Sequence, residues 1–156
     1  MYRNWFYLNS KANKDIYSQN DSYQFVNEFP INLYYPISPT PRVSLLEISF
    51  PLRFDDYDFT QIYNFLVKLD IVEDSLFGDK RINLLRHIQL APSSEKHKLA
   101  KFEFKNLILA DLRRNSIKRI EVSICDIEGN ILVVKKDPQY LKEVPTILLC
   151  ATTNQR

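Results

Sequence analysis

Hydrophobic residues along this chain fill short uninterrupted runs or alternate with polar residues, and both patterns are typical of β-strands. The densest run is Arg42–Pro51, which carries five large apolar residues and no glycine and has prolines on both sides. A helix there would have to start beside two prolines and stop at a third, whereas a buried central strand is a nearly continuous apolar run. The pattern therefore predicts a central strand over 42–51.

Two further segments alternate strictly, as a strand with one buried face does. Ile117–Asp126 places isoleucine and valine on one face and polar residues on the other. Ser22–Phe29 alternates in the same way, and we expect Pro30 to end that strand. Its predicted inner face consists of Tyr23, Phe25, Asn27 and Phe29. Shorter apolar runs elsewhere bring the expected total to about eight or nine strands.

One segment has the spacing of a helix instead. It follows the central strand and an acidic, aromatic stretch in which Asp58 is a suitable N-cap residue. The spacing predicts a short helical insertion, although a strand over 62–72 also fits the same residues. The apolar residues that recur at this spacing are Ile62, Phe65, Leu66 and Leu69.

The strand count and the size of the chain favour an all-β fold in one domain. A chain of 156 residues is long enough to bury a single core, so we expect residues 1–156 to form one domain. About eight strands without alternating helices predict a sandwich or barrel, and the double-sheet jelly roll is one standard arrangement. An immunoglobulin-like sandwich and a closed barrel remain open as alternatives, although Trp5 and the two late cysteines do not follow the antibody pattern.

Charge and hydropathy point to no charged partner. The net charge of +2 provides no overall field that would recruit nucleic acid or an anionic membrane. The apolar runs fall short of the ~20 residues that a membrane-spanning helix needs, so we expect no membrane insertion. The N-terminus lacks the apolar stretch of a signal peptide, which predicts use inside a cell. In a reducing compartment Cys125 and Cys150 are expected to be thiols.

No residue pattern predicts catalysis, a metal or a cofactor. The standard nucleophile, phosphate-loop and zinc motifs are absent from the sequence. His87 and His97 are isolated, and Cys125 has no nucleophile motif around it. Three acidic residues could gather around a hard cation, but no calcium-loop pattern surrounds Asp55, Asp56 and Asp58. A basic cluster could meet phosphates, yet such clusters are usually solvated: Arg113, Arg114, Lys118 and Arg119.

Aromatic residues are dense in the segments that flank the central strand. They either cap one end of the sandwich or contact a neighbouring subunit, since Tyr and Phe are enriched at interface centres. The predicted interface residues are Tyr34, Tyr35, Phe54, Tyr57, Phe59 and Tyr63.

Several short motifs, taken in order, resemble one known family. Tyr7-Leu8-Asn9-Ser10 is followed by Tyr23-Gln24-Phe25 and by the run over 42–51, which ends in Leu-Glu-Ile-Ser-Phe-Pro. Phe102-Glu103-Phe104 and a late strand closed by Gly129 come afterwards. In this order the chain resembles the penton, or minor capsid, proteins of Polinton/Maverick elements, virophages and related DNA viruses.

The resemblance implies a structural virion protein. It would be a single jelly roll that forms homopentamers at the fivefold vertices of an icosahedral capsid, surrounded by a double-jelly-roll major capsid protein. Its location would be the virion capsid, after assembly in the host cytoplasm or nucleus. The residues alone leave an alternative from another class, a monomeric β-sandwich module that binds carbohydrate or peptide through its aromatic loops.

Overall fold

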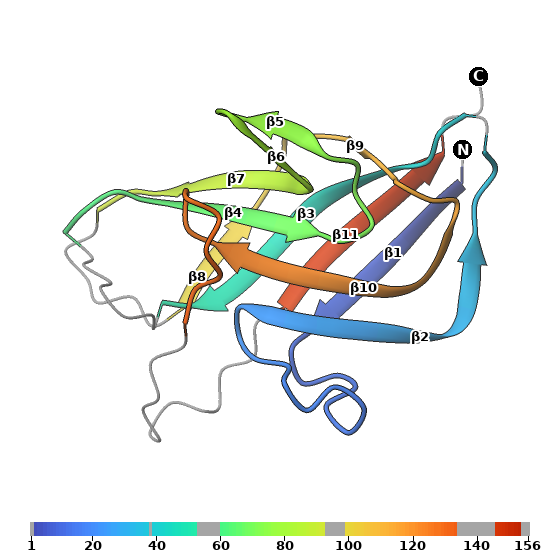
Figure 1. The fold of residues 1–156 in the computed structure, drawn as a ribbon, viewed down its shortest axis with the longest axis horizontal. Helices are drawn as coiled ribbons and strands as arrows, with labels where there is room; N and C mark the ends of the chain where they lie inside the picture. The colour runs from blue at the N-terminus through green and yellow to red at the C-terminus, as the bar shows by residue number, and fades with distance from the viewer. Residues whose placement is uncertain (1, 38, 53–59, 93–98, 134–145, 154–156) are drawn as a thin grey trace.

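A computed structural model of the chain describes residues 2–37, 39–52, 60–92, 99–133 and 146–153. Among these residues there are eleven strands and no helix, and every strand pairing is antiparallel (Figure 1). The all-β prediction is confirmed. The strands are β1 (Tyr2–Asn9), β2 (Gln24–Tyr34), β3 (Arg42–Pro51), β4 (Tyr63–Leu69), β5 (Ser75–Phe77), β6 (Lys80–Ile82), β7 (Leu84–Leu90), β8 (Leu99–Glu103), β9 (Ala110–Asp111), β10 (Ser116–Cys125) and β11 (Thr146–Thr153).

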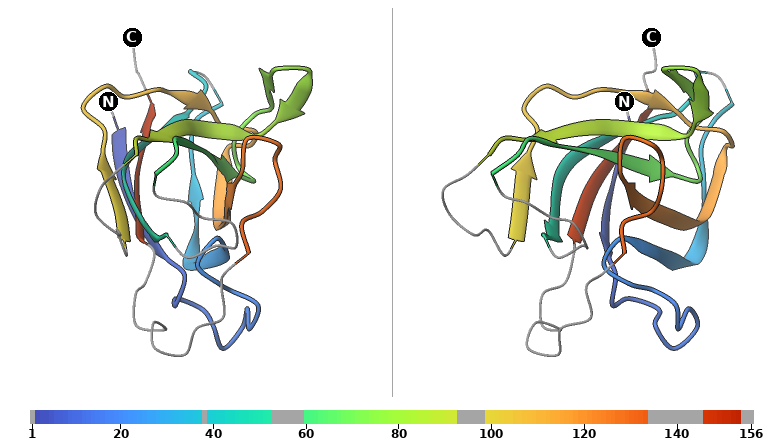
Figure 2. Two further views of the ribbon diagram at one scale, coloured as in Figure 1. Left: turned by 90° about the vertical axis from the view of Figure 1, so that its left-hand side faces the viewer. Right: turned by 60° about the vertical axis from the view of Figure 1, so that its left-hand side comes forward.

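The strands form two main sheets and one small hairpin. Sheet A has the order β1-β11-β3-β8, with the short β9 also paired to β3. Sheet B has the order β2-β10-β4-β7, and β5 and β6 form the hairpin. The two sheets lie as two layers, which the side view in Figure 2 shows most clearly. The fold is therefore a β-sandwich with its core between the sheets.

Phe50 lies at the centre of this core. It is fully buried on β3 of sheet A, and its ring packs edge-on against Phe65 of sheet B at a centroid distance of 5.2 Å. The rings of Tyr23 and Phe102 are 6.5 and 6.2 Å away. Burying such a side chain contributes about 1.5–3 kcal/mol, so this aromatic group is a principal contact between the sheets.

The helix expected after the central strand is wrong for the residues described, because 63–69 form strand β4. Phe65 and Val67 are buried on the core side. Leu66 faces the other side, where it pairs with Cys125 of β10, and both of these residues are also buried. A strand that is buried on both faces shows no period of two, so its apolar residues matched a helical spacing by coincidence. Asp58, the expected N-cap, lies outside the described residues.

Strand β2 does not end at Pro30 as expected but continues to Tyr34. Its register with β10 shifts at this point, because Arg119 pairs with Glu28 while Ile117 pairs with Leu33. The intervening residues form a bulge, where a proline is tolerated, and β2 is moreover an edge strand. The second half of β2 bends away from the sheet in Figure 1.

The sandwich has two flanks, where the edge strands of the two sheets face each other. On the β1–β2 flank the rings of Phe6 and Phe29 are 5.3 Å apart, and Asn27 exchanges hydrogen bonds with the backbone of Asn9. On the β7–β8 flank Arg86 of β7 lies 4.1 Å above the ring of Phe104. These contacts hold the two sheets together at both edges.

Candidate interaction surface

The structure separates the aromatic residues that were predicted to form an interface. Tyr34 is 74% exposed, whereas Tyr35 is buried and its hydroxyl accepts a hydrogen bond from Nδ2 of Asn4 at 3.0 Å. Tyr63 is half-buried and stacks on Phe65 at 6.2 Å. The remaining three, Phe54, Tyr57 and Phe59, lie outside the described residues.

The described aromatic residues do not form one cluster. Tyr34 pairs with Ser116 at the first residue of β10, while Tyr63 lies beyond the other end of that strand, where Cys125 pairs with Leu66. With about 3.3 Å per residue, Ser116 and Cys125 are roughly 30 Å apart along β10, and Tyr63 lies three residues beyond the partner of Cys125. An interface that contains Tyr34 therefore draws its other members from elsewhere.

Five large apolar side chains are exposed on the two strands of the β1–β2 flank or just beyond β2. Trp5 and Tyr7 are two residues apart on β1 and share the face turned away from the core, with 57% and 63% exposure. The other three lie on β2 or just beyond its end. We call the five residues the β1–β2 surface: Trp5, Tyr7, Ile31, Tyr34 and Ile37.

The sequence did not place Trp5 and Tyr7 among the predicted interface residues. Phe6 and Leu8, which alternate with them, fill the core and are buried. The available signal was that β1 is apolar at every position from Trp5 to Leu8. An edge strand with one solvent face needs apolar residues only at alternate positions. The additional apolar residues therefore indicate a contact on the outer face of the strand.

A second exposed apolar segment lies on the β7–β8 flank. Leu107, Ile108 and Leu109 are consecutive and are 48%, 55% and 43% exposed. The chain leaves the edge of sheet A after Phe104, whose N–H donates to the carbonyl of Leu46 at 2.8 Å, and returns to β3 at β9. We call these three residues the 107–109 segment.

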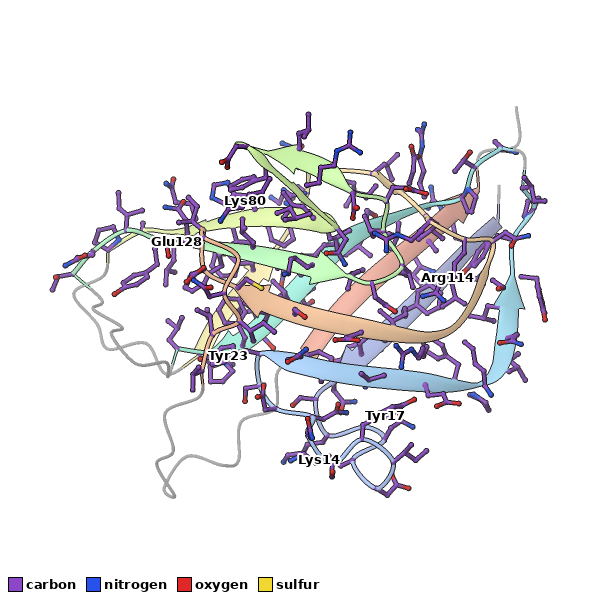
Figure 3. The ribbon with its side chains drawn as sticks, in the orientation of Figure 1. Lys14, Tyr17, Tyr23, Lys80, Arg114 and Glu128 are labelled. Atoms are coloured by element: carbon purple, nitrogen blue, oxygen red, sulfur yellow. The ribbon has the colours of Figure 1, made fainter. Side chains whose placement is uncertain are left out.

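The basic cluster near the start of β10 is matched by carboxylates. All four of its side chains contact an acidic partner, and Figure 3 shows Arg114 beside β10. This pairing lowers the local positive potential and leaves a weak surface for phosphate. The nitrogen–oxygen distances are 2.6 Å for Arg113–Asp74, 3.2 Å for Arg114–Asp70, 3.3 Å for Lys118–Glu28 and 3.9 Å for Arg119–Glu121.

Asp70 ties the end of β4 to β10. Its Oδ1 accepts a hydrogen bond from the backbone N–H of Glu121 at 2.8 Å, and its Oδ2 lies 3.2 Å from Arg114. Burial nevertheless raises the pKa of Asp70 above its ordinary value of 3.8, because desolvation outweighs the hydrogen bond and the guanidinium. The folded state therefore binds this proton more tightly than the unfolded chain does.

We expect the contribution of Asp70 to stability to fall as the pH rises. A raised pKa favours folding most below 3.8, and that contribution is lost as the pH rises through the folded-state value. Urea titrations give the free energy of unfolding of the natural chain and of Asp70→Asn at each pH. The natural value minus the variant value should become smaller as the pH rises above about 3.8. A difference that grows with pH would instead mean that the ion pair with Arg114 dominates.

The described residues contain a shallow hollow but no arrangement typical of an active site. The hollow has a volume of about 480 Å³ and is lined mainly by polar residues of the 16–24 region. Tyr17 lines it and donates a hydrogen bond to Glu28 at 2.7 Å, which raises the pKa of Tyr17 (Figure 3). Burial raises the pKa of the Cys125 thiol, which opposes a nucleophilic role.

The part of the chain that the structure describes offers neither a metal-binding cluster nor a membrane-spanning helix. No group of three His, Cys, Asp or Glu side chains there is placed to bind a metal ion. No helix there has the length and hydropathy needed to span a membrane. His87 forms a hydrogen bond with Asn64 at 2.9 Å on the exposed face of sheet B.

The exposed features that distinguish this molecule are thus the β1–β2 surface and the 107–109 segment, on the two flanks of one sandwich. Exposed apolar patches of this kind mark contacts with other molecules more often than catalytic sites. No model of a known protein family matches the chain, and no curated protein matches it either.

Proposed function

We propose that the protein is a structural virion protein, a penton-type minor capsid protein that forms homopentamers at the fivefold vertices of an icosahedral capsid. The observation that carries the proposal is the strand order of the two sheets, β1-β11-β3-β8 and β2-β10-β4-β7. In the proposed assembly the pentamer is surrounded by a double-jelly-roll major capsid protein and is located in the virion.

The strand order supports a single jelly roll as the finer description of the sandwich. The eight long strands form four antiparallel pairs that join the first to the last, the second to the last but one, and so on inwards. These pairs are β1 with β11, β2 with β10, β3 with β8 and β4 with β7. One long two-stranded ribbon folded over itself produces this pairing, which is the double Greek key of jelly rolls.

Two further observations favour a capsid role for such a fold. Jelly rolls occur in viral capsid proteins, and the motifs that resemble the penton family occur in the expected order along the chain. A subunit in a ring needs rigid apolar anchors rather than an active site, and the β1–β2 surface offers Trp5, Tyr7 and Tyr34. The small net charge of +2 per chain limits repulsion among five copies.

Electron cryomicroscopy of particles that contain this protein tests the proposal. We expect density for five copies of the sandwich at each fivefold vertex, in contact with the surrounding major capsid protein. Density for the sandwich on the facets, or particles whose vertices are filled by another chain, would contradict the assignment.

A second candidate function is favoured by the pair Trp5 and Tyr7. Their side chains share one exposed face of β1 and start about 7 Å apart, so the two rings could stack on successive sugar rings of a carbohydrate. Because Trp5 is the only tryptophan, its fluorescence reports binding directly. A saturable change on titration with oligosaccharides would favour a monomeric carbohydrate-binding module, whereas the capsid proposal predicts no change.

A further inference from the structure

We propose that one repeated contact closes the homopentamer, in which the β1–β2 surface of each copy packs on the 107–109 segment of the next. This inference rests on the proposed function, because it specifies the surface through which the five copies associate. The occupant of each apolar surface is thus a second copy of this chain.

The two surfaces have the relative placement that a ring requires. A closed ring is built from a heterologous contact, in which two different patches of the same subunit meet. The β1–β2 surface includes the outer face of β1 at one edge of sheet A, and the 107–109 segment lies beside β8 and β9 at the other edge. Three strand spacings of about 4.8 Å separate these edges, so the patches point to different neighbours.

The exposed area on the β1–β2 surface is large enough for the centre of a stable interface. A whole aromatic side chain buries about 150–250 Å², so the exposed parts of Trp5 and Tyr7, which share one face of β1, amount to about 250 Å². This is about a third of the ~800 Å² that each partner buries in a specific interface of standard size. Trp and Tyr also supply most binding hot spots.

Hydrogen bonds on both sides fix the backbone around the 107–109 segment, which suits it to receive the β1–β2 surface of the next copy. Next to the segment, the carbonyl of Asn106 accepts a hydrogen bond from Nη1 of Arg86 at 2.8 Å, and on its other side Ala110 pairs with Val43. These anchors limit the entropy that the segment loses on binding. Lys105 and Asn106 are exposed beside the three apolar residues, which corresponds to a polar rim around an apolar centre.

A second copy explains both surfaces at once. Each chain leaves an aromatic patch on one flank and an aliphatic patch on the other, with most of the side chains about half exposed or more. A foreign partner on one flank would leave the other patch in solvent, whereas a head-to-tail contact covers both on every subunit. The two patches differ in composition, which disfavours an isologous dimer in which one patch meets itself.

Complementation between two variants tests this contact. One variant is Trp5→Ser with Tyr34→Ser, and the other is Leu107→Ser with Leu109→Ser. We expect light scattering to give about 92 kDa for the natural chain, which is five times 18.5 kDa, and 18.5 kDa for each variant alone. An equimolar mixture should give a two-chain species of about 37 kDa, because each mixed pair retains one intact contact.

Controls separate loss of contact from loss of fold. Ile16→Ser removes a 63% exposed side chain that belongs to neither surface and should leave the ring intact. A circular dichroism spectrum like that of the natural chain and a cooperative unfolding transition show that a variant is folded, since loss of assembly alone lowers the melting temperature. Tyr7→Ser with Ile37→Ser replaces the first variant if that variant is not folded. Rings formed by either folded variant alone, or no mixed dimer, overturn the inference while the proposed function stands. A natural chain that stays monomeric overturns the proposed function and the inference with it.

Discussion

Replacing Phe50 with alanine is expected to lower the free energy of unfolding by about 3–5 kcal/mol, the usual cost of truncating a buried phenylalanine. Phe50 is fully buried and contacts the rings of Phe65, Tyr23 and Phe102, so its removal leaves a cavity between the two sheets. A total stability of about 5–15 kcal/mol is typical of a domain, so this one change removes a large share. Urea denaturation followed by circular dichroism measures the loss.

Phe77→Ala provides the matched control for this prediction. Phe77 belongs to the small β5–β6 hairpin, is only half-buried and lies 6.0 Å from the ring of His87. Its truncation should cost about 1 kcal/mol or less. Similar losses for the two variants would mean that the aromatic contact between the sheets is not the principal one.

Replacing Asn27 with alanine is expected to cost about 2 kcal/mol, which is the second-largest effect. The Asn27 side chain is 4% exposed and links β2 to the last residue of β1. Its Oδ1 accepts from the N–H of Asn9 and its Nδ2 donates to the carbonyl of Asn9, both at 2.8 Å. The alanine variant leaves the N–H of Asn9 unpaired and leaves its carbonyl only the 3.3 Å hydrogen bond from the N–H of Ala12. Each of the two lost hydrogen bonds contributes about 1 kcal/mol.

Hydrogen exchange provides a local measurement of the same change. The amides of β1 should exchange faster in Asn27→Ala than in the natural chain, because the edge strand loses its hydrogen bonds to sheet B. The control is Asn32→Ala, whose side chain is exposed and reaches only the Tyr34 hydroxyl at 3.4 Å. Unchanged β1 exchange in Asn27→Ala would show that pairing with β11 and the remaining contacts, such as Phe6 with Phe29, hold this strand without Asn27.

The strands that were predicted best are those whose burial differs between their two faces or whose ends are set by proline. The predicted bounds of the central strand, 42–51, are those of β3. The alternation over 117–126 corresponds to β10, with Ile120, Val122 and Ile124 buried. In these strands the order of apolar and polar residues along the sequence directly reflects which residues are buried, so no tertiary information was needed.

The failures arose where tertiary contacts decide the outcome. Leu66 is buried on the face of β4 turned away from the core, beside Cys125, which is 59 residues distant in sequence. Pro30 continues a strand because β2 is an edge strand with a bulge against β10. The order of strands in the two sheets depends on long-range pairing such as β1 with β11, which no local pattern records.

The candidate surface was predicted only in part for a related reason. Tyr34 and Tyr35 are neighbours in the sequence, but successive residues of an extended chain point to opposite sides, so one is exposed and the other is buried. Aromatic density therefore located the region without separating its two faces. Trp5 and Tyr7 become surface candidates only once β1 is known to be an edge strand.

The most direct test of the central claim, a closed ring of five copies, is the mass of the purified natural chain by light scattering across a range of concentrations and salt. The proposal predicts one species of about 92 kDa, five times the 18.5 kDa of one chain, that persists in high salt because its contacts are apolar. A mass that remains at 18.5 kDa up to the highest concentration, or that settles at two chains, would contradict it.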